Sequence, residues 1–188
     1  AFLLAKCVFG WQIYFDFSGY TDMGRGLGRM LGILIMLKFN NPDLATGLGD
    51  FWRRWYISLS TWFSDYVYIP LGGSRIHLPR TVVNLLVTMS ISGLWHGAGF
   101  TFLVWGGLLG VALATWHALR SRFHSLAGIA EEHHLAARSL VPWAFTMLVA
   151  VVGWVYFRAE SVSQANAVVA SMFGAGSGAE RGPLAEYG

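Results

Sequence analysis

Two long intervals of the chain contain no Asp, Glu, Lys or Arg. The first covers residues 81–119, between Arg80 and Arg120, and the second covers residues 139–157, between Arg138 and Arg158. A helix that crosses a bilayer needs about 20 residues of apolar sequence. We therefore predict a transmembrane hairpin over 81–119 and one further transmembrane helix over 139–157. Arginine residues flank both ends of the hairpin, and the excess of Lys and Arg in cytoplasmic loops favours a cytoplasmic position for both ends.

Residues 49–70 have a different pattern, in which aromatic side chains recur at helical spacing and polar side chains take much of the opposite face. Trp52, Trp55 and Tyr56 belong to the aromatic set, and Asp50 precedes Arg54 by four residues, a favourable helical pair. Pro70 and two following glycines end the pattern. This stretch is predicted to be one helix that lies in the headgroup plane or lines a polar cavity.

Small residues recur four apart at Gly93 and Gly97, at Gly106 and Gly110, and within 24–32. Glycine at this spacing lets transmembrane helices approach closely. The G-x-G pattern around residue 24 does not indicate a nucleotide site, because no strand precedes it and no acidic residue follows at the expected distance.

Composition supports an integral membrane protein. The 188 residues are 55% hydrophobic and 12% charged, about half the charged fraction of an ordinary soluble domain. The net charge of +3 forms no basic stripe of the kind that nucleic acid requires. One cysteine, Cys7, allows no internal disulfide, and we predict no metal site, because Glu131–His134 lacks further ligands at i+4. The chain begins with Ala1 inside an apolar run, so we interpret 1–188 as one membrane-domain fragment of a longer protein.

His96 is the strongest candidate for chemistry. It lies in the charge-free interval, roughly 24 Å along a helix from Arg80. Ionisable residues inside a membrane are costly and usually face a cavity or a partner. A neutral imidazole can take a proton from a hydroxyl nucleophile, which suits acyl transfer from a thioester to an alcohol. The same imidazole could relay protons in a transporter, and composition does not decide between the two.

Several motifs, in order along the chain, resemble the membrane-bound O-acyltransferase family, most closely its bacterial alginate O-acetyltransferase-like branch. They run from about residue 12 to about residue 173. The motifs are Tyr14–Met23, Phe51–Trp55, Ile57–Ser60, Asp65–Gly73, Ser92–Ala98 and Trp154–Glu160.

The resemblance implies an all-α, polytopic membrane fold, here a partial multi-helix bundle with interfacial helices and a tunnel. It implies that His96 is the principal catalytic residue. The acyl donor would be a cytoplasmic thioester, acetyl-CoA or an acyl carrier, with no bound cofactor. The acceptor would be a hydroxyl, often on an exported polysaccharide, reached directly or through an extracytoplasmic partner protein. The location implied is the bacterial inner membrane.

Five further residues form the predicted substrate-binding set. Trp95 would form a tunnel wall or pack as an interfacial ring. Arg53 and Arg54 would meet donor phosphates, because a guanidinium matches phosphate oxygens, or would anchor to headgroups. Trp52 belongs to the same motif, and Tyr56 would orient donor or acceptor.

Tyr56 stands where close relatives in this branch commonly carry a second histidine, and a phenol is a poor base. Ser64 likewise replaces a usual basic residue. These departures leave a second hypothesis open, a catalytically impaired scaffold or export component. A proton-coupled transporter is the third, although the repeated broken helices of transporters are not visible.

Overall fold

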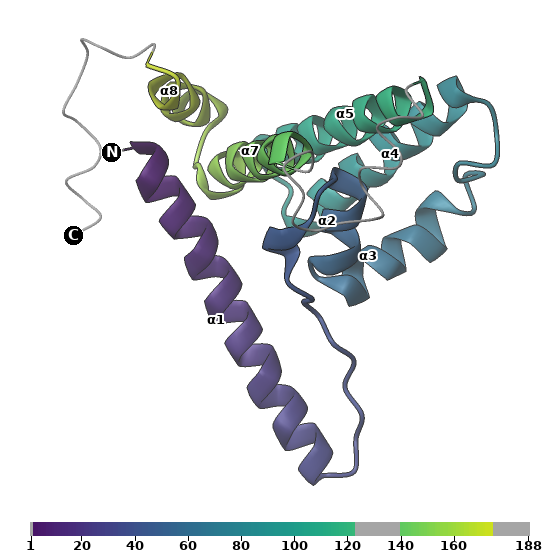
Figure 1. The fold of residues 1–188 in the computed structure, drawn as a ribbon, viewed down its shortest axis with the longest axis vertical. Coiled ribbons are helices and arrows are strands. Elements are labelled where there is room, and N and C mark those ends of the chain that lie inside the picture. Colours follow the sequence, from purple (N-terminus) through teal and green to yellow (C-terminus); the bar gives the residue numbers. More distant parts are fainter. Residues whose placement is uncertain (1, 123–139, 175–188) are drawn as a thin grey trace.

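The computed structural model describes residues 2–122 and 140–174, and this part of the chain is helical without β-strands, as the predicted fold class requires (Figure 1). The Glu131–His134 run, where no metal site is expected, lies outside these residues. The elements in chain order are α1 (Phe2–Met30), η1 (Pro42–Leu44), α2 (Leu48–Arg54), α3 (Ile57–Phe63), the π-helical turn η2 (Ser64–Tyr68), α4 (Leu78–His96), α5 (Phe100–Arg122), α7 (Leu140–Arg158) and α8 (Val162–Met172).

Helices α4 and α5 form an antiparallel hairpin whose turn lies at residues 97–99 (Figure 1). Glycines bring the two backbones together. A Cβ on Gly93 would overlap the carbonyl of Phe102, and one on Gly106 would overlap the carbonyl of Met89. We call this contact the glycine seam. It confirms that small residues in this part of the sequence allow close helix approach.

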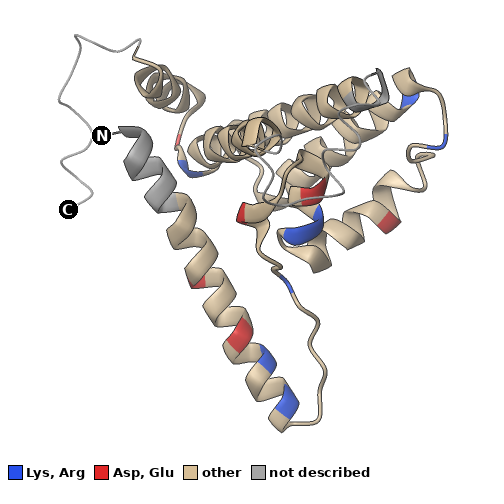
Figure 2. Cartoon of the chain, in the orientation of Figure 1, with Lys and Arg blue, Asp and Glu red and all other residues tan. Residues whose placement is uncertain are grey.

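Helix α7 packs against α5, and Gly153 lies under the indole of Trp105, where an added Cβ would be 3.3 Å from the Trp105 nitrogen. In the described residues, two segments are long and apolar enough to cross a membrane, Phe100–Leu119 of α5 and Leu140–Arg158 of α7. Both are free of charge along their apolar length (Figure 2). Helix α4 is not among them, and several of its polar residues are buried. A second span in the 81–119 hairpin therefore stays a prediction.

The expectation of one helix over 49–70 is wrong, because α2 ends at Arg54 and α3 begins at Ile57. Tyr56, between them, has a left-handed backbone with φ of 44°. The break is fixed by an extended segment that precedes α2. The Asn40 amide donates to the Arg54 carbonyl at 2.9 Å, and the Ile57 amide donates to the Lys38 carbonyl at 2.8 Å. Backbone pairing with a distant segment thus replaces the helical bonds that Tyr56 would otherwise continue.

Helix α1 contacts the rest of the fold mainly through its first half, against α7 and α8. Gly10 abuts the ring of Trp154, whereas an added Cβ on Gly24 would meet nothing within 4 Å. An added Cβ on Gly28 would lie 3.0 Å from the Ile33 carbonyl and from the Ile35 side chain, so this glycine packs against the returning segment and not against another helix. The second half of α1 projects away from the bundle, and Figure 1 shows the chain returning beside it to α2.

Candidate functional site

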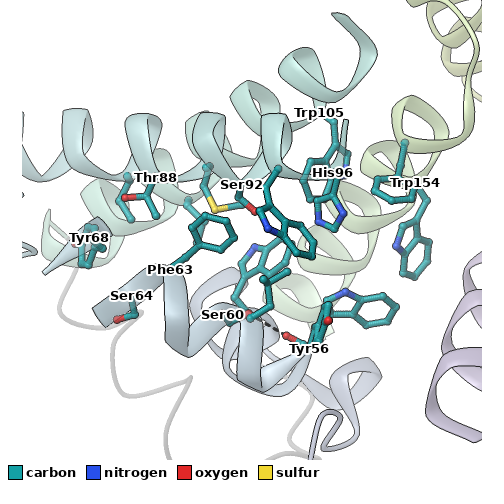
Figure 3. A pocket seen from close by; sticks show the side chains of 18 of the residues that line it. Tyr56, Ser60, Phe63, Ser64, Tyr68, Thr88, Ser92, His96, Trp105 and Trp154 are labelled. Carbon is teal, nitrogen blue, oxygen red and sulfur yellow. Dashed lines mark hydrogen bonds between the residues drawn. The ribbon is translucent and has the colours of Figure 1, made fainter. Parts of the chain in front are cut away.

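A largely apolar chamber of about 510 Å³ lies between α2, α3 and η2 on one side and the α4–α5–α7 bundle on the other (Figure 3). Seven helical elements contribute side chains to its wall, so the chamber exists only in the folded structure and not within any single sequence motif. The residues that line it are Ile13, Phe17, Trp52, Trp55, Tyr56, Leu59, Ser60, Phe63, Ser64, Tyr68, Leu85, Thr88, Met89, Ser92, Trp95, His96, Trp105, Leu113, Trp154 and Phe157.

His96 is the last residue of α4 and reaches the chamber at the tip of the hairpin. Its ring is surrounded by aromatic rings in edge-to-face geometry, with centroid distances of 5.0 Å to Trp95, 5.2 Å to Trp105 and 5.2 Å to Phe157. Figure 3 shows the imidazole beside Trp105 and facing the chamber. The side chain is half-buried. Within the described part of the chain, its nitrogens have no hydrogen-bond partner, so both are available to a ligand.

The glycine seam sets the position of this imidazole. Because Gly93 and Gly106 bring backbone against backbone, α5 places Trp105 directly beside the end of α4. Gly97 then ends α4, and a Cβ there would lie 2.6 Å from the ring of Phe102. Main-chain contacts at Gly93 and Gly106 and the Phe102 ring at Gly97 therefore position the polypeptide around the histidine.

The chamber has few polar groups that remain available. The Ser60 hydroxyl donates to the Trp55 carbonyl at 3.0 Å, and the Thr88 hydroxyl donates to the Asn84 carbonyl at 2.7 Å. Burial raises the pKa of the Tyr68 phenol. A phenol is protonated at neutral pH even at its ordinary pKa of about 10, so this group can donate a hydrogen bond. An apolar wall with a small number of oriented polar groups is typical of a small-molecule site.

Three of the predicted substrate-binding residues share the chamber with His96. Trp95 and Tyr56 line it, and so does Trp52, whose ring lies 6.2 Å from that of Trp105. The Trp52 indole nitrogen is buried without a hydrogen-bond partner among the described residues. The sequence therefore pointed to residues that are far apart along the chain and adjacent in the fold.

Arg53 and Arg54 do not line the chamber. Arg54 donates to the Asp50 carboxylate at 2.8 Å, which confirms the helical pair expected from their spacing. Arg53 is exposed. A role of either arginine in binding donor phosphates stays a prediction.

Several chamber residues are not predicted from the sequence. Trp105 and Met89 lie in charge-free sequence where nothing distinguishes a cavity wall from a lipid-facing residue. Phe157 is part of the Trp154–Glu160 motif, so its importance could have been noticed. Phe17 lies in the first motif and lines the chamber from α1.

Comparison with known proteins identifies the relatives of this fold. The family model described as MBOAT, membrane-bound O-acyltransferase family, matches residues 2–156. The chain is 46% identical over 167 residues to "Probable alginate O-acetylase AlgI" of Azotobacter vinelandii, covering 88% of this chain and 31% of that protein. It is 39% identical over 166 residues to "Peptidoglycan O-acetyltransferase" of Helicobacter pylori, covering 88% and 30%.

A more distant relative is "Teichoic acid D-alanyltransferase" of Streptococcus thermophilus, 30% identical over 113 residues, which cover 56% of this chain and 27% of that protein. The chain thus spans about a third of the length of the curated relatives it matches. The names of these relatives share one reaction class, transfer of an acyl group, and differ in the acceptor.

Proposed function

Because the chain belongs to the membrane-bound O-acyltransferase family and is therefore part of an integral membrane protein, we propose that it forms the catalytic part of an O-acyltransferase. The observation that supports this most strongly is an imidazole without a hydrogen-bond partner in the described chain, at the wall of a largely apolar chamber. Related proteins named as O-acetylases favour acetyl as the acyl group.

The proposed reaction needs one base and a chamber that excludes water. A neutral His96 takes the proton of the acceptor hydroxyl while the hydroxyl oxygen attacks the thioester carbonyl. The carbon–sulfur bond then breaks, and the departing sulfur takes the proton from the imidazolium. The products are an ester and a free thiol, so atoms and charge balance without another reactant. A positioned base of this kind contributes typically 10²–10⁴-fold to the rate.

The other groups of the chamber would hold the reactants. Trp52 has a buried indole N–H without a partner in the described residues, and an unpaired buried donor is costly unless a ligand satisfies it. Tyr56 and Trp95 line the chamber beside the reacting groups. We propose a cytoplasmic thioester, either acetyl-CoA or an acyl carrier, as the donor. An exported polysaccharide, reached directly or through an extracytoplasmic partner protein, is the proposed acceptor, and the inner membrane is the proposed location.

The test is acyl transfer by the full-length protein, reconstituted in lipid, with His96→Gln compared with wild type. His117 of α5 provides the matched control, because it is also half-buried in the hairpin but does not line the chamber. We expect His96→Gln to lose at least about a hundredfold in kcat and His117→Gln to retain the wild-type rate. Transfer that survives unchanged in a folded His96→Gln protein would refute the proposal.

Tyr56 supports the competing hypothesis of an impaired scaffold, since a phenol occupies the chamber position where a second histidine was expected. The wild-type arm of the same experiment separates the two. A folded wild-type protein that transfers no acyl group from any thioester donor would favour the scaffold.

A further inference from the structure

A second, smaller cavity of about 250 Å³ lies between α1 and the extended segment that precedes α2. Its character is opposite to that of the chamber, because polar side chains supply most of its wall. The residues that line it are Tyr14, Ser18, Thr21, Asp22, Leu37, Lys38, Phe39, Asn40 and Asn41. Lys38 is the one lysine or arginine in the lining of either described cavity.

Lys38 lies between the two cavities. Its ammonium nitrogen is 5.6 Å from the ring centroid of Phe17 and 5.4 Å from that of Tyr56, and both rings line the apolar chamber. Cations within about 6 Å of an aromatic face are attracted to it. The Lys38 carbonyl also accepts the amide of Ile57, which fixes the backbone beside Tyr56. The charge is therefore held in place at the border of the chamber.

The charge of Lys38 is not matched by a carboxylate. In the described ranges, the ion pairs join Arg25 to Asp22 at 3.3 Å and Arg54 to Asp50 at 2.8 Å, and neither includes Lys38. Asp22 belongs to the same polar cavity, but its charge is countered by Arg25. The cavity lining itself holds one positive charge, Lys38, and one negative charge, Asp22, and Arg25 beside it brings the local sum to +1. A lysine without a carboxylate partner, together with amide and hydroxyl groups, can bind an anion.

We propose that this polar cavity holds a phosphate of the acyl donor through the Lys38 ammonium. The thioester arm of the donor would then reach the chamber past Phe17 and Tyr56. The proposal rests on the proposed acyltransferase function and places the phosphate site at Lys38, whereas the sequence suggested Arg53 and Arg54. Arg54 is occupied by Asp50, and Arg53 is exposed and lines neither cavity.

The experiment measures binding, independently of turnover. The full-length protein is reconstituted in nanodiscs of uncharged phosphatidylcholine, and tryptophan quenching reports binding of coenzyme A or of pantetheine, which lacks phosphate. The variants are Lys38→Met, Lys38→Arg and, as a control, Arg29→Met, which removes an exposed cation of α1 outside both cavities. Lys38→Met should weaken coenzyme A binding about tenfold and leave pantetheine binding unchanged. Lys38→Arg should retain most of the affinity, and Arg29→Met should retain all of it.

Two results would overturn the proposal. Equal weakening of coenzyme A and pantetheine would mean that Lys38 acts only by holding the Phe17 and Tyr56 rings. If Lys38→Met changes coenzyme A binding only when anionic phosphatidylglycerol is added, the Lys38 ammonium binds a lipid headgroup and not the donor phosphate. A failure of the proposed function looks different, because the wild-type protein would then bind coenzyme A through Lys38 and transfer no acyl group.

Discussion

Gly106→Ala is the sharpest test of how the hairpin is built. The added Cβ would overlap the Met89 carbonyl and lie 3.2 Å from the Cα of Ser90. Both are backbone atoms of α4, so no side-chain rotation relieves the overlap and the two helices must separate. Overpacking of this kind costs typically 1–3 kcal/mol, whereas replacing a helical glycine by alanine otherwise gains up to about 1 kcal/mol.

The adjacent Gly107 is the matched control, because it shares the helix but an added Cβ there meets nothing within 4 Å. We expect Gly107→Ala to be neutral or stabilising, and Gly106→Ala to be less stable than this control by about 1–3 kcal/mol. Thermal unfolding of the full-length variants in one detergent measures the difference. Equal melting temperatures for the two variants would refute the argument that backbone contact sets the α4–α5 distance.

Two further predictions concern the α2–α3 region. Arg54→Met should destabilise the protein by about 1 kcal/mol, because it leaves the half-buried Asp50 carboxylate unpaired. Arg53 is exposed, so Arg53→Met should change stability by less than about 0.5 kcal/mol. Chemical denaturation compares the two variants, and equal losses of stability would contradict the prediction. Tyr56→Gly should be more stable than Tyr56→Ala by about 1 kcal/mol, since glycine tolerates the left-handed backbone. Tyr66 is the control, because its φ is not positive, and there the alanine variant should be more stable than the glycine variant. If glycine were the more stable replacement at both positions, the backbone at Tyr56 would not be the cause.

The sequence predicted the parts of this fold that depend on local pattern. The charge-free interval that ends at Phe157 corresponds to α7, and the interval between Arg80 and Arg120 lies within the α4–α5 helix pair with its turn at 97–99. These features are local because an apolar stretch of the right length favours a helix whatever surrounds it. The candidate histidine was equally visible, because an ionisable residue stands out against charge-free sequence.

The break at Tyr56 could not be predicted in the same way. Its aromatic spacing continues that of α2, so the local pattern favours an uninterrupted helix. The break depends on hydrogen bonds to Lys38 and Asn40, which belong to a segment that the helical period does not reveal. For the same reason Lys38 was missed, since its relation to Phe17 exists only once α1 and the extended segment are folded together.

The glycine seam affects the position of the base and only part of the shape of the chamber. The backbone that carries the base is held by main-chain contacts at Gly93 and Gly106, which side-chain rotation cannot relieve. Part of the chamber wall is formed away from this seam, by side chains of α1, α2 and α3. Substitutions on those three helices can therefore enlarge or narrow the chamber for a different acyl group without moving the backbone of His96.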